Sequence, residues 1–282
     1  MAVRPGNFQQ NDTLNRYLLF FPRNANALND VHSFTGEEAL SQPYRYTIRF
    51  TSPNANIPPD AILNQKAEFL LRAPNPEASW HGQSSWLPVR QINGTITAFS
   101  RVKSSSDEAL YECVLEHELA LLNRNFRSAV YTDVTVPEVV TQLMKESRYF
   151  EGFNIDFDSL RCTYPRREMI IQWKETDLEF IRRLLAEVGI WFRLENHSTT
   201  PTETVVIFGD SASRYIISEK KFPFVRRSGM TSHDEYVTEL EERHALIPEN
   251  IMVRSYNYRD PLSPQADKTI VSNNIPVMTP TY

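Results

Sequence analysis

Cysteine and histidine are scarce in this chain of 282 residues. The two cysteines, Cys113 and Cys162, have no metal-ligand spacing, and nothing in the sequence supports a disulfide between them. The six histidines are scattered, and the nearest pair, His233 and His244, does not form the His-x-x-x-His motif of zinc helices. We therefore expect two reduced, partly buried thiols in a protein made in the cytoplasm, with no metal site and no cofactor.

Glycine is also rare. Among the eight glycines the closest two, Gly82 and Gly94, are twelve positions apart. The G-x-G-x-x-G fingerprint and the phosphate-binding P-loop both need closely spaced glycines, so neither can be written. This excludes nucleotide-binding folds of those two kinds.

Long apolar runs and an excess of positive charge are absent too. Residues 1–12 are polar and lack the apolar segment of a signal peptide, and no run approaches the roughly 20 apolar residues of a membrane span. The formal net charge is −5, whereas nucleic-acid-binding proteins carry a clustered basic excess. We expect no stable membrane insertion and no nucleic-acid partner.

What is present indicates a folded, mainly β protein of about two domains, since 41% of the residues are hydrophobic and 11% aromatic. Short runs rich in β-branched and aromatic residues alternate with turns rich in Pro, Asn and Ser, a pattern typical of a barrel or a sandwich. The runs that predict strands are 17–21, 44–50, 67–71, 95–99, 110–115, 204–208, 214–217 and 250–256.

Two helices are predicted by their N-terminal signals. Thr135 and Glu138 have the spacing of a capping box, and Pro137 lies in the first turn. Thr176 and Glu179 form a second capping box after a predicted strand at 169–173. The apolar residues of this second helix recur at helical spacing and predict a buried face: Leu178, Ile181, Leu184, Leu185 and Val188.

The other face of the second helix is charged. Glu179 precedes Arg183 by four residues, which favours an ion pair between them. Gly189 stands where a left-handed residue ends a helix, and residues 190–194 read as the next strand. The segment therefore predicts a strand, a helix and a strand.

The search for catalytic residues yields two weak candidates. Ser211 follows an apolar strand, as in GDS-type esterases, but no histidine has an aspartate three places before it, so we favour a turn at the end of the strand. In Glu116-His117-Glu118, an alternating strand would separate the histidine from the carboxylates, which argues against a metal site. We expect no enzymatic activity and no catalytic, cofactor-binding or metal-binding residues.

Four stretches of the chain carry a resemblance to a known family. The clearest is QWKETDLEF at 172–180, continued through 183–190, and three further groups agree in order and spacing: 34 with 38–41 and 43–46, then 90–97, then 253–261. These stretches resemble VgrG proteins, the spike-tip components of type VI secretion systems, whose fold is similar to the baseplate hub of contractile phages. Where the family commonly has a glycine, this chain has Asn64, which tolerates a left-handed backbone.

The resemblance implies an α+β, mainly β fold of two small barrel-like domains with helical inserts, similar to a phage tail hub. We expect a first barrel at 1–127, a helical connecting region at 128–189, a second barrel at 190–261, and a linker at 262–282 toward an OB-like domain and a needle.

The resemblance also implies a structural function: the hub would join a hexameric tube to the trimeric spike and would be delivered with effectors. The implied partners are two further copies of the chain, the tube protein, baseplate components and an effector or adaptor. Export would use the type VI apparatus, without a signal peptide. The alternatives are the baseplate hub of a phage-derived contractile tail and, with less support, an esterase that uses Ser211.

Overall fold

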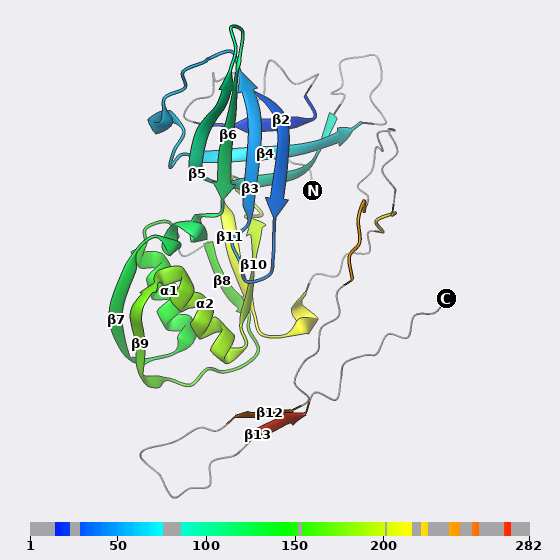
Figure 1. Cartoon of the computed structure of the whole chain (residues 1–282). Helices are drawn as coiled ribbons and strands as arrows, with labels where there is room; N and C mark the ends of the chain where they lie inside the picture. The colour runs from blue at the N-terminus through cyan, green and yellow to red at the C-terminus, as the bar shows by residue number, and fades with distance from the viewer. Residues whose placement is uncertain are drawn as a thin grey trace, which may run out of the picture. The chain divides into compact units, whose positions relative to one another are not determined.

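The computed structural model describes residues 15–22, 29–75, 86–151, 154–200, 202–215, 221–224, 237–242, 250–253 and 268–271. The chain divides into two compact units, Met1–Lys220 and Lys221–Tyr282. The first unit contains a six-stranded sheet and, next to it in the chain, a part built from helices and strands (Figure 1).

The six-stranded sheet is antiparallel throughout. Its strands, in spatial order, are β1 (Tyr17–Phe20), β4 (Lys66–Pro74), β5 (Trp86–Ser104), β6 (Ala109–Glu116), β3 (Arg45–Ser52) and β2 (Asp30–Glu37). The strands predicted between positions 17 and 115 are confirmed.

The sheet curls into a half-barrel, which brings side chains of its two edge strands together (Figure 1). Tyr17 of β1 meets Phe34 of β2 edge to face, with ring centroids 5.1 Å apart, and Phe34 meets Phe69 of β4 at 5.0 Å. Alternation along β3 points Ile48 and Phe50 into the same core, where both are fully buried. Aromatic side chains thus fill the curl between the edge strands.

The second part of this unit is layered. The helices α1 (Val136–Glu146) and α2 (Asp177–Val188) pack beneath a two-stranded antiparallel ribbon and share one apolar core with a three-stranded sheet (Figure 1). The ribbon consists of β7 (Phe126–Val134) and β9 (Arg167–Thr176). The sheet has the order β10 (Trp191–Asn196), β11 (Thr204–Gly209) and β8 (Ile155–Ser159), with β8 parallel to β11.

Both predicted capping boxes are confirmed. Thr135 caps α1 with Glu138, and Thr176 caps α2 with Glu179. Gly189 ends α2 with a left-handed backbone, φ 72°. These signals are local, which explains why the sequence specified them: each joins atoms only a few residues apart.

The predicted pair between Glu179 and Arg183 is wrong. The Glu179 carboxylate is used in the capping box, where it accepts from the Thr176 N–H at 2.9 Å. Arg183 binds instead to Glu175, at 2.6 Å, and to Glu187, at 3.0 Å. The carboxylate at the third position of the helix therefore binds the backbone N–H of the capping residue, and not the side chain of the arginine one turn later.

Other local predictions have mixed outcomes. Asn64 takes the predicted left-handed backbone, φ 57°. Both cysteines are free, but only Cys113 is buried, and burial raises the pKa of its thiol to about 12, whereas Cys162 is exposed. The strand predicted at 214–217 overlaps a 3-10 turn, η5 (Ala212–Arg214), and its last two residues lie outside the described part of the chain.

The predicted domain boundaries stay predictions. Contacts divide the chain after Lys220, and β10 and β11, expected in a second barrel, share a sheet with β8. Most of the remaining residues of that barrel lie outside the described part of the chain. In the second unit, β12 (Asn250–Val253) pairs with β13 (Lys268–Val271), which places a strand inside the segment predicted as a linker.

Candidate functional site

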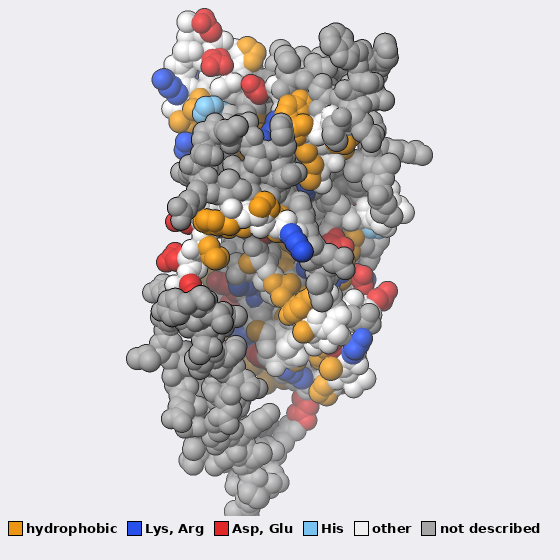
Figure 2. All heavy atoms as spheres, turned by 90° about the vertical axis from the view of Figure 1, so that its right-hand side faces the viewer, with side chains coloured by type: hydrophobic (Ala, Val, Ile, Leu, Met, Phe, Trp, Pro, Cys, Tyr) orange, Lys and Arg blue, Asp and Glu red, His pale blue; other side chains and the backbone are white. Residues whose placement is uncertain are grey.

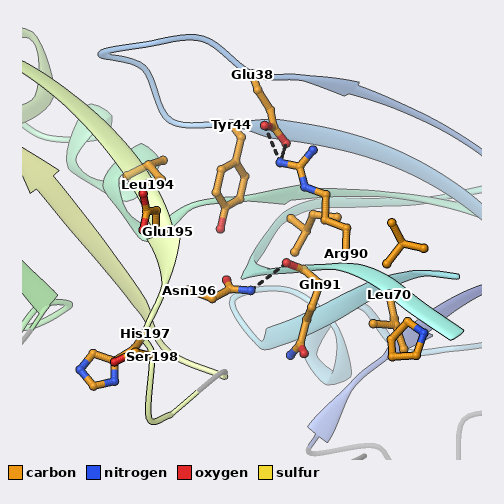
Figure 3. Close-up of a pocket in the computed structure, with 13 residues that line it drawn as sticks. Glu38, Tyr44, Leu70, Arg90, Gln91, Leu194, Glu195, Asn196, His197 and Ser198 are labelled. Carbon is orange, nitrogen blue, oxygen red and sulfur yellow. Dashed lines mark hydrogen bonds and ion pairs between the residues drawn. The ribbon is translucent and has the colours of Figure 1, made fainter. Parts of the chain in front are cut away.

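A groove of about 540 Å³ lies between the six-stranded sheet and β10. Figure 3 shows its side chains converging from β5 on one side and from β10 and the residues after it on the other. Its lining combines aliphatic and polar side chains, and the residues include Glu38, Tyr44, Leu70, Arg90, Gln91, Leu194, Asn196 and His197.

Amide side chains join the two sides of this groove. The Asn196 side chain of β10 donates to the Gln91 carbonyl at 2.9 Å and accepts from Asn93 at 3.1 Å. Gln91 in turn donates to the Asn93 side chain at 2.9 Å and to the Glu68 carboxylate at 3.1 Å. The two bonds of Asn196 connect residues 105 and 103 positions apart, so they hold β10 against the sheet.

An ion pair and a partly buried tyrosine close one end of the groove. Arg90 contacts both carboxylate oxygens of Glu38, at 2.5 and 2.6 Å, and Tyr46 donates to the same carboxylate. The Tyr44 hydroxyl donates to the Asn93 carbonyl. Burial, with the nearby charges of Glu118 and Glu38, raises the pKa of Tyr44 well above its usual value. Tyr44 therefore acts as a neutral donor to the carbonyl of Asn93, a buried residue of β5.

A second buried contact between the two parts involves Glu116-His117-Glu118, and here the strand prediction is wrong. β6 ends at Glu116, and His117 caps a 3-10 helix, η3 (Glu118–Asn123), by accepting from the Leu119 N–H at 3.1 Å. His117 Nε2 lies 3.8 Å from the Glu118 carboxylate and makes no hydrogen bond in the described structure. Burial lowers the pKa of His117 to about 3.

The Glu118 carboxylate extends this contact to the three-stranded sheet by accepting from the Thr204 hydroxyl at 3.3 Å. Burial raises the pKa of Glu118. Beside it, at the surface, Lys66 of β4 pairs with Glu203 at 3.0 Å. The tripeptide is therefore part of the connection between the curled sheet and β11, which is a structural use of its carboxylate.

Ser211 lies in a turn at the end of β11, as predicted. Its hydroxyl caps η5 by accepting from the Ser213 N–H at 3.3 Å, and it lies 3.0 Å from the Ser213 hydroxyl. In the described structure both of these partners belong to Ser213, so no histidine base is placed at the serine.

The preceding Asp210 has a defined structural use. One carboxylate oxygen accepts from the N–H groups of Arg161 and Cys162, at 2.8 and 2.7 Å, and from the Tyr164 hydroxyl at 3.0 Å. These donors lower the pKa of Asp210 to about 2, with the backbone bond from Cys162 as the largest cause. The carboxylate thus organises the loop between β8 and β9.

The remaining carboxylates do not gather into a site in the described part of the chain. Asp156 accepts from the Asp158 N–H at 2.8 Å, and Glu239, Glu241 and Glu242 are exposed in the second unit. Among the described residues there is no group of three or more His, Cys, Asp or Glu that could hold a metal ion. None of the described helices is both long and apolar enough to cross a membrane.

Sequence reasoning missed an exposed apolar face on the ribbon β7–β9. Strand alternation turns Tyr131 and Ile170 toward the helices, and the opposite face carries large apolar side chains. The exposed set is Phe126, Val130, Met169, Ile171 and Trp173, and we call it the ribbon face. The signal that could have found it is the uninterrupted apolar run at 169–171, since a strand with one face in water normally alternates with polar residues.

Figure 2 views the molecule from the side opposite β7 in Figure 1. It shows apolar side chains here in several separate groups, interspersed with charged ones. Single exposed apolar residues are normal on protein surfaces, whereas five on one pair of strands are unusual. The ribbon face and the groove are thus the two features of the described surface that call for a functional explanation.

Known proteins share this architecture. The type VI secretion system spike protein VgrG5 of Pseudomonas aeruginosa is 28% identical over 236 residues, which cover 82% of this chain and 27% of that protein. The type VI secretion system spike protein VgrG3 of Vibrio cholerae is 23% identical over 240 residues, covering 82% of this chain and 22% of that protein. The chain thus spans about a quarter of the length of these relatives.

A solved structure agrees with the sequence relatives. An E. coli component of the type VI secretion system, structurally similar to the T4 bacteriophage tail proteins gp27 and gp5, superposes with a TM-score of 0.61. It is 36% identical, and the match covers 74% of this chain and 53% of that one. The model of the phage tail baseplate hub (GPD) family matches residues 37–278. The match extends over most of the sequence, and the chain therefore belongs to the phage tail baseplate hub family.

Proposed function

We propose that this chain is the hub portion of a type VI secretion spike, joining a hexameric tube to a trimeric spike. The observation that carries the proposal is the agreement in fold and sequence with the E. coli type VI component, together with the spike proteins among its relatives. The curled sheet with its own aromatic core is a preformed, rigid module, as a docking surface in a contractile machine requires.

Two similar β modules in each chain would allow a threefold hub to bind a sixfold tube. Three copies would then present six docking surfaces around one axis. The six-stranded sheet is the first module, within residues 1–127. The second module would be formed by residues 190–261, and its resemblance to the first would lie in folded shape, because the two segments show no evident sequence identity.

The proposed role is structural and needs no catalytic residue in this chain. Ser211, the best candidate from sequence, and the neighbouring Asp210 have structural hydrogen-bond partners. The partners would be two further copies of the chain, the tube protein, baseplate components and an effector or adaptor. Export would follow from delivery by the type VI apparatus, with no signal peptide needed.

The proposal is tested by deleting the coding region in its own bacterium and measuring the tube protein released into the medium. Release should stop in the deletion strain and return when the wild-type chain is supplied. Ser211→Ala should restore release as fully as wild type does. Undiminished release from the deletion strain would refute a hub role in secretion, and failure of a folded Ser211→Ala chain would favour an enzymatic one.

A further inference from the structure

We propose that the ribbon face is the surface on which a second copy of this chain docks when the hub assembles. The inference rests on the proposed function, because the hub role requires several copies around one axis. It goes beyond that function by naming the interface, which neither the sequence motifs nor the family match identifies.

The first argument is the geometry of the ribbon. Val130 lies opposite Ile171, and Met169 lies opposite Thr132 two pairs along the antiparallel register, on the same side of the ribbon. All of these side chains point away from the helices, since Tyr131 and Ile170, which alternate with them, are buried in the core. Register therefore gathers apolar groups from both strands on one side of a rigid ribbon, with no rearrangement needed to display them.

The second argument is area. Phe126 is 72% exposed and Trp173 is 67% exposed. The other three residues of the ribbon face are each at least 43% exposed. A fully exposed aromatic side chain offers about 150–250 Å², so Phe126 and Trp173 together expose roughly 200–350 Å², to which the three aliphatic residues add. A standard interface buries about 800 Å² on each partner. The ribbon face alone thus supplies a substantial part of one partner's share of a stable protein contact.

The third argument is charge. The charged residues that border the ribbon face are paired within the chain: Arg127 contacts Asp177 at 2.6 Å, and Arg183 contacts Glu175 at 2.6 Å. Lys174 lies over the Trp173 ring, 5.4 Å from its centroid. The five side chains of the ribbon face are themselves uncharged, and Lys174 adds a single positive charge beside them, far less than the clustered basic excess of nucleic-acid-binding proteins.

A second copy of the chain meets these conditions because it offers a protein surface and needs no complementary charge on the ribbon face. Three equivalent copies close a ring through heterologous contacts, in which the ribbon face of each copy meets a different surface of the next. Every copy then buries its ribbon face once. Because the ring is closed, no ribbon face remains free to bind a further copy, and the assembly does not continue into a fibre.

The experiment places a photoreactive benzoylphenylalanine at Trp173 in the chain expressed from its own locus, followed by illumination of the assembled spike. Crosslinked products at multiples of the protomer mass are expected, reaching three copies. The control places the same residue at Val102, which is exposed on β5 away from the ribbon. Products that contain only another protein, or no more self-crosslinking than the Val102 control gives, would overturn the proposal.

A second measurement uses matched valines. Val130→Ser and Val102→Ser both remove an exposed strand valine, so they have similar effects on the fold. In sedimentation experiments over a wide concentration range, Val130→Ser combined with Trp173→Ser should raise the dissociation constant of the chain at least tenfold, as expected for loss of an aromatic hot spot. Val102→Ser should leave it within about twofold.

The tube-release assay separates the two proposals. If the ribbon variants are folded and still release tube protein at wild-type level with unchanged self-crosslinking from other positions, the ribbon face is not the contact between copies, while the hub role stands. If deletion of the chain leaves release unchanged, the hub role fails whatever the ribbon variants do.

Discussion

Gly209 of β11 lies directly opposite Trp191 of β10 in the antiparallel register, and the indole ring covers the position that a side chain at 209 would occupy. A Cβ added at Gly209 would overlap three atoms of that ring. The glycine is therefore required by a close approach across the strands, since its backbone needs no left-handed conformation.

We expect Gly209→Ala to lower the free energy of unfolding by about 1–3 kcal/mol, the usual cost of overpacking a filled core. Chemical denaturation measures it directly. The matched control is Gly209→Ala in a Trp191→Leu background, where the smaller side chain leaves room. The cost should be smaller there, and an equal cost in both backgrounds would show that the ring is not the cause.

Leu184→Asp should unfold the first unit or cause it to aggregate. Leu184 is fully buried between the helices and the sheet, and an unpaired carboxylate there costs several kcal/mol, comparable to the roughly 5–15 kcal/mol stability of a typical domain. Thermal melts followed by circular dichroism provide the measurement. Arg182→Ala, on the exposed face of the same helix, is the control and should melt close to wild type. A near-native melt for Leu184→Asp would contradict the assigned packing.

Thr176→Ala should destabilise the chain by about 1 kcal/mol through loss of the N-cap. The hydroxyl accepts from the Glu179 N–H at 3.2 Å and also donates to Asn123 at 2.8 Å, so it joins the start of α2 to η3. Thr176→Ser keeps the hydroxyl and should recover most of the loss in the same denaturation experiment. If Ser and Ala are equally destabilising, the methyl group and not the cap is what matters.

Stability should fall as the pH drops from about 6.5 toward 3, and His117 should account for part of that loss. The unfolded chain binds a proton on this imidazole near pH 6.5, whereas the folded chain does so only near pH 3. Between these values the unfolded state holds more protons, so acid favours unfolding, on the order of 3 kcal/mol by pH 4. The raised pKa of Glu118 acts in the opposite direction and partly offsets this loss.

The measurement compares melting temperatures between pH 7 and pH 4 for wild type and His117→Asn. Asparagine can still cap η3 but does not titrate. The wild-type melting temperature should fall further over this range than that of the variant, while Asp210 and the other carboxylates affect both proteins alike. Parallel curves for the two proteins would show that His117 is not buried in its neutral form.

Much of this fold could be predicted because its signals are local. A capping box joins residues three positions apart, so the helix-end residues Thr135, Thr176 and Gly189 were assigned from the sequence alone. The alternation of apolar and polar residues along a strand such as β3 likewise indicates which side chains are buried. The family followed from collinear motifs. That Ser211 ends a strand in a turn was equally local, since its hydroxyl binds a residue two positions on.

Only the tertiary structure decided which distant groups meet. The choice of Glu175 as a partner of Arg183 depends on how β9 runs beside α2, and the bond between Asn93 and Asn196 crosses 103 positions of sequence. The ribbon face was missed for the same reason: the run at 169–171 shows that both faces of the strand are apolar, but not which of them is left without a packing partner. Burial is a property of what packs against a residue, so the sequence determined the elements and their faces, and the packing of those elements determined the contacts and the surface left for a partner.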